Sequence, residues 1–186
     1  MHSFVHACAS GDLDKAKQLL AAGGVDIHAD DDKAFAEACA NGHLKVAQWL
    51  HTLGGVDRHL YSDGAFRWAC YFGRLDVAQW LVTLGGVNVH SRHDFAFTNA
   101  CSRGHLMVVQ WLFALGGVDV HVGNDAAFRW ACDSGHRDVG RWLCGLEPEW
   151  AWPAQGMQAL RTWSLARDAW MRSVLRDCTT ASRVVQ

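Results

Sequence analysis

The sequence predicts an all-α solenoid, in which antiparallel helix pairs stack one on another through short connecting loops and end in a helical C-terminal cap. One motif, Phe-x-x-Ala-Cys-x-x-Gly, occurs five times with a period of 31 residues, which is typical of stacked repeats. The apolar residues of each period have helical spacing, and glycines follow where a helix would end. Because one such unit buries its apolar side only against neighbouring units, the units must stack.

The repeats predict the domain organisation. The array covers residues 1–146, and its five units start near residues 1, 32, 63, 94 and 125. The chain begins inside the first helix of the first unit. That unit carries Gln18 where the later units carry tryptophan, so we expect it to close the N-terminal end with a more polar outer face.

The first helix of a unit is predicted by an aspartate, an apolar stripe and a glycine. In the third unit, Asp63 is placed to cap the first turn, and Asp32, Asp94 and Asp125 hold the same position in other units. Phe66 and Cys70 then lie on one face of a short helix, which Gly73 ends.

The second helix of the same unit follows after a turn of one or two residues, so the two helices must be antiparallel. Leu75, Ala78 and Leu81 form its apolar row, and the glycine pair at 85–86 supplies the left-handed conformation that stops it. A connector, Val-Asn-Val-His at 87–90, leads to the next unit.

Together these features resemble an ankyrin repeat over about residues 1–146. The segments most similar to the family's Ala-Ala-x-x-Gly-His-Leu stretch are 38–50 and 100–106. Two features depart from the family: the Thr-Pro-Leu-His tetrapeptide is absent, and the period is 31 rather than about 33 residues. The deficit falls in the connector, so the projecting hairpin should be short. The variant is similar to Trp-rich arrays of protists, algae and large DNA viruses.

Residues 147–186 do not follow the period. They predict two further helices, near 154–163 and 165–178, which we interpret as a cap on the last unit. The alternative is a docking segment. In that case the protein would be a substrate-recognition adaptor for a ubiquitin ligase, as in ankyrin proteins that carry an F-box-like segment at this end.

Composition narrows the function. The formal net charge of −2 makes nucleic-acid binding unlikely, and no apolar run approaches the ~20 residues of a membrane span. One cysteine per repeat predicts small buried side chains rather than disulfides, which suits a reducing compartment. We therefore expect a cytoplasmic protein and a monomer.

The sequence contains no recognisable catalytic or metal-binding motif. Histidines recur in the connectors and after the turn glycines, but members of one row should lie a repeat apart, too far to share an ion. We expect them to make structural hydrogen bonds. No nucleophile with a base and no phosphate-binding loop is present. The prediction is a protein that is not an enzyme, with no metal, no cofactor and no small-molecule substrate.

Tryptophan recurs in the second helices at Trp49, Trp80, Trp111 and Trp142. These residues keep the register of the apolar row, so we expect them to pack between repeats rather than to form an aromatic binding surface.

The candidate binding residues are those that the period does not fix. They lie on the first helices, the surface through which the resemblance implies that a partner protein binds. Trp, Tyr and Arg are also the residue types that dominate binding hot spots. An alternative is that Trp68 and Trp130 pack against Asn99 and other neighbours in their own stack. The predicted partner-binding residues are Arg67, Trp68, Tyr71, Phe72, Asn99, Arg103, Arg129 and Trp130.

Overall fold

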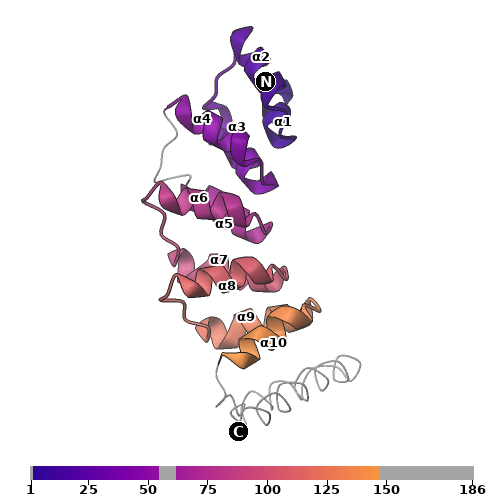
Figure 1. Ribbon diagram of the computed structural model, residues 1–186, viewed down its shortest axis with the longest axis vertical. Helices are drawn as coiled ribbons and strands as arrows, with labels where there is room; N and C mark the ends of the chain where they lie inside the picture. The colour runs from indigo at the N-terminus through magenta and orange to yellow at the C-terminus, as the bar shows by residue number, and fades with distance from the viewer. Residues whose placement is uncertain (1, 55–61, 147–186) are drawn as a thin grey trace.

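The computed structural model describes residues 2–54 and 62–146, and within these ranges it contains ten α-helices in five pairs and no strand. Figure 1 shows the pairs following one another along the long axis of the molecule. The first helices of the pairs are α1 (His2–Ala9), α3 (Ala29–Asn41), α5 (Ser62–Tyr71), α7 (Ser91–Ser102) and α9 (Val122–Asp133). The second helices are α2 (Leu13–Ala21), α4 (Leu44–Thr52), α6 (Leu75–Thr83), α8 (Leu106–Ala114) and α10 (Arg137–Gly145).

The predicted fold class is confirmed: the chain is a stack of helix pairs. Residues 147–186 lie outside the described residues. The predicted cap and the alternative ligase-docking segment therefore stay predictions.

The motif residues form one continuous core. Each first helix packs against the first helix of the next pair, from α1 through to α9. The phenylalanine and cysteine of each motif are buried at these contacts, as Phe66 and Cys70 are in the third unit. Burial raises the pKa of the Cys8 thiol to about 11 and that of the Cys39 thiol further still. The cysteines of the array are thus apolar packing residues, as predicted.

The tryptophans of the second helices pack against aromatic rings of the preceding units. The Trp111 ring lies 6.3 Å from the Phe66 ring of the preceding unit, measured between ring centroids. Phe4 with Trp49 and Phe35 with Trp80 repeat this contact at the same separation. In the last unit Trp142 meets Phe113 edge to face at 5.4 Å. The prediction that this row packs between repeats is confirmed.

A second inter-repeat contact joins the turns between paired helices. The His105 ring lies over Gly73 of the preceding unit, and its Nε2 donates to the Tyr71 carbonyl at 3.0 Å. His43 makes the equivalent bond to the Ala9 carbonyl. Between the second and third units Arg74 takes the place of the histidine and donates from Nε to the Ala40 carbonyl. The carbonyls at the ends of α1, α3 and α5 are thereby satisfied across units.

The connectors contain a third repeated contact, and here the sequence-based prediction was wrong. Asp32 was expected to cap the first turn of its helix through backbone N–H groups. Its carboxylate instead accepts from Nδ1 of His28 at 2.6 Å. The reason is that residues 30–32 have left-handed backbone angles, so the carboxylate faces the connector. His90 with Asp94 and His121 with Asp125 form the same pair, at 2.6 and 2.8 Å.

Candidate functional site

The first helices leave four positions per unit outside the shared core, and we call the surface that they form the inner face. In the third unit these positions hold Arg67, Trp68 and Tyr71 on α5 and Phe72 directly after its end. Ala69 and Cys70, which separate them in sequence, are completely buried. Because α1, α3, α5, α7 and α9 pack in a row, the same four positions of neighbouring units lie side by side.

The structure brings four of the predicted binding residues into one cluster, which we call the aromatic patch: Trp68, Tyr71, Phe72 and Arg103. The Trp68 and Phe72 rings are stacked at 5.9 Å, and Tyr71 meets both edge to face. Arg103, from the next unit, places its guanidinium 4.2 Å from the centre of the Tyr71 ring. These contacts fix the rings against one another on the surface.

The aromatic patch is open to solvent although it is largely apolar. Trp68 is 50 % exposed and Phe72 43 % exposed. In contrast, Phe66 on the same helix is fully buried. Among residues 2–54 and 62–146, no carboxylate forms an ion pair with Arg103 of the patch or with Arg67 beside it.

The remaining predicted residues lie around the patch and not in it. Arg67, Asn99 and Arg129 are half-buried on α5, α7 and α9. Trp130 is 40 % exposed, one unit beyond Asn99. Within the described part of the chain no ring contact or hydrogen bond joins Trp68 or Trp130 to the Asn99 side chain. The alternative in which Asn99 holds the two tryptophans therefore has no such contact to support it.

The electrostatic surroundings of the patch affect one histidine. The pKa of His105 is lowered, first by burial of the ring against the preceding unit and then by the nearby charges of His136, Arg74 and Arg103. The Tyr71 carbonyl can only accept, so the His105 ring donates its Nε2 proton to it, and the neutral ring can do so.

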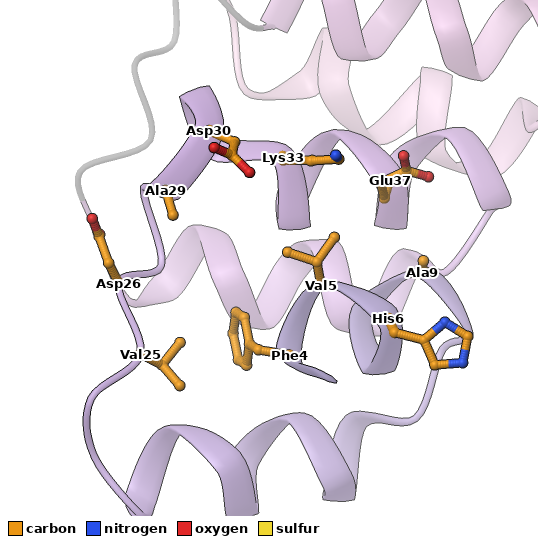
Figure 2. A pocket seen from close by; sticks show the side chains of 10 residues that line it. All are labelled: Phe4, Val5, His6, Ala9, Val25, Asp26, Ala29, Asp30, Lys33 and Glu37. Carbon is orange, nitrogen blue, oxygen red and sulfur yellow. The ribbon is translucent and has the colours of Figure 1, made fainter. Parts of the chain in front are cut away.

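A pocket of about 260 Å³ opens at the N-terminal end of the inner face, between α1, α3 and the connector that joins the first two units. In Figure 2, Val5 of α1 points toward α3 and Phe4 points toward Val25 of the connector, while Lys33 and Glu37 lie on α3 at the other side. We call it the N-terminal pocket. Sequence reasoning missed it, although small residues at Val5 and Ala9, where the third unit has Arg67 and Tyr71, are a signal for it.

Within 2–54 and 62–146, no group of three His, Cys, Asp or Glu side chains is placed to hold a metal ion. In the described part of the chain, every helix is too short or too polar to cross a bilayer.

Comparison with known families gives a match over most of the chain. A model described as ankyrin repeats in three copies matches residues 4–93 and, overlapping with that range, residues 66–150. A comparison with curated proteins finds no match.

Proposed function

Because the chain belongs to the ankyrin-repeat family, whose repeats are generally protein–protein interaction modules, we propose that it binds a partner protein through its inner face. The aromatic patch is the centre of this surface. Arg67, Asn99, Arg129 and Trp130 complete it on the neighbouring helices.

The observation that carries the proposal is the exposure of the patch. In four units, the tryptophan of the second helix packs against an aromatic ring of the preceding unit. In contrast, the ring contacts of Trp68 and Phe72 are with each other and with Tyr71. Large aromatic rings that are held rigidly and stay half-exposed lose little entropy on binding and bury much apolar area. Arg103 adds a charged group of the kind enriched in hot spots.

We further propose that the protein is a monomer and not an enzyme. We place it in a reducing compartment such as the cytoplasm. The support for this placement is the cysteine row: the five motif thiols are buried packing residues, and burial keeps the thiols of Cys39, Cys70 and Cys101 protonated by raising their pKa. Such a use of cysteine is common where thiols stay reduced.

The test is a comparative capture experiment with the double variant Trp68→Ala/Tyr71→Ala. Proteins retained by the wild-type chain are identified by mass spectrometry, and the dissociation constant of each candidate is then measured with purified protein. We expect the variant to bind the true partner at least ~30-fold more weakly, because the loss of even one hot-spot side chain costs about 2 kcal/mol or more.

The matched control is Met107→Ala, which removes an exposed apolar side chain from α8, on the second-helix side. Met107 is 66 % exposed, so its loss should affect neither folding nor binding. Equal binding by the wild-type chain and the patch variant, at equal helicity by circular dichroism, would refute the proposal.

A further inference from the structure

The N-terminal pocket has a composition unlike the rest of the inner face. Its walls are apolar where α1 and the connector form them, through Phe4, Val5 and Val25. Its rim is acidic, with Asp26 and Asp30 before and within the first turn of α3 and Glu37 two turns further along. An apolar interior under an acidic rim fits a ligand with an apolar stem and a cationic end.

The size of the pocket limits the ligand further. Sites for whole small molecules and cofactors usually enclose about 300–1,000 Å³. The N-terminal pocket is slightly smaller and is open on one side, so it suits a single long side chain inserted from a bound protein. Lysine and arginine side chains have the matching form, since they bury their methylene stems and keep the charged head at a polar rim.

The charge balance favours a cation. Three carboxylates line the pocket against one ammonium, that of Lys33. None of the three forms an ion pair with Lys33, and Asp30 makes no side-chain hydrogen bond to any described residue. Asp26 uses one oxygen to accept from the His28 amide, and the Glu37 carboxylate accepts from Asn41 at 3.4 Å. Both retain acceptor capacity for a guanidinium or ammonium group.

The pocket also lies on the proposed binding surface. Glu37 holds on α3 the position that Trp68 holds on α5, one unit later, and these two helices pack against each other. A chain laid along the inner face across the aromatic patch would therefore continue toward the pocket.

We infer that the N-terminal pocket binds a lysine or arginine side chain of the partner protein. The inference rests on the proposed function only in that a protein supplies this side chain. The stem packs on Phe4 and Val25, and the cationic group pairs with a carboxylate at the rim, either Asp30 or Glu37.

The experiment uses defined peptides, so it needs neither the partner nor the aromatic patch. The peptide acetyl-Gly-Gly-Arg-Gly-Gly-amide is titrated into the full, ¹⁵N-labelled chain, and amide chemical shifts are followed by NMR. We expect shifts that saturate on the order of 1–10 mM and are confined to residues around the pocket, since one partly solvated ion pair and one side-chain stem give weak binding. The same peptide with neutral citrulline in place of arginine should shift these amides at least fivefold less.

The matched protein variant is Asp30→Asn/Glu37→Gln, which removes two charges and keeps the shape. Asparagine tolerates the left-handed angles of residue 30, so the variant should keep the wild-type fold and lose the arginine-dependent shifts. Lys33→Ala should bind the arginine peptide at least as well as the wild-type chain. The inference would be overturned by absent shifts, by equal shifts with the citrulline peptide or by unchanged binding to the carboxylate variant. Larger shifts with a peptide that has glutamate in place of arginine would also overturn it. Because Trp68 and Tyr71 take no part, failure here leaves the proposed function standing, and the reverse also holds.

Discussion

Trp111 and Trp68 have opposite environments, although both come from the middle of the array. Trp111 lies on a second helix, packs against Phe66 of the preceding unit and recurs at the same place in three other units. Trp68 lies on a first helix, is half-exposed, and has Glu37 and Asn99 at the same place in the neighbouring units. Residues that recur with the period therefore hold the stack together, whereas residues that differ from unit to unit lie on its exposed inner face.

The same distinction applies within the inner face. Where the first unit has Val5 and Ala9, an open pocket with an acidic rim results. Where the third unit has Arg67 and Tyr71, a basic aromatic surface takes its place. One scaffold thus presents two chemically opposite sites, because the repeated contacts do not depend on these positions.

The largest expected effect comes from Trp111→Ala. The substitution leaves Phe66 without its partner across the unit boundary, and truncation of a large aromatic residue in a core costs about 3–5 kcal/mol. Because Trp111 is only half-buried, we expect a loss near the lower end, about 3 kcal/mol in the free energy of unfolding measured by urea titration. Trp68→Ala is the control and should cost less than about 1 kcal/mol. Similar losses for both variants would contradict the distinction between the two tryptophans.

A smaller effect is expected from Gly73→Ala. Residue 73 has a φ of +73°, and a Cβ there would lie 2.6 Å from Nδ1 of His105, so the ring must move and its bond to the Tyr71 carbonyl is weakened. We expect a loss of about 2 kcal/mol, combining a left-handed backbone cost of ~1 kcal/mol with the weakened hydrogen bond.

The matched control for this variant is Gly85→Ala in the same unit. Residue 85 has a φ of +79° but open space around a new Cβ, so only the backbone cost of ~1 kcal/mol remains. If thermal or urea unfolding finds equal losses at positions 73 and 85, the contact between turn glycine and histidine contributes nothing to the stack.

Sequence reasoning reached the helix pairs, the buried cysteines and the tryptophan row because each depends on local spacing that the period repeats. It identified Trp68, Tyr71, Phe72 and Arg103 as exceptions to the period, but not the contact of Arg103 with the Tyr71 ring, which depends on how neighbouring units meet. It failed at Asp32 because capping was inferred from position alone, whereas the left-handed angles of residues 30–32 direct the carboxylate to His28. The N-terminal pocket was missed because it forms only where a connector and two helices meet in space.

The smallest expected effect is a change in pH dependence from His105→Gln. The folded chain lowers the pKa of His105, so the unfolded chain binds its proton more readily as the pH falls through the ordinary value of ~6.5. The stability linked to this ring is therefore complete above that pH and is lost as the pH falls toward the lowered pKa of the folded state. Glutamine still offers an N–H group to the Tyr71 carbonyl but does not titrate.

We expect the free energy of unfolding of the variant to fall less between pH 7.5 and pH 5 than that of the wild-type chain. The effect is limited because the ring is only half-buried and solvent screens its charged neighbours. Parallel curves from urea titrations across this range would show that His105 titrates alike in the folded and unfolded chains. The contact that it makes over Gly73 would then act through packing alone.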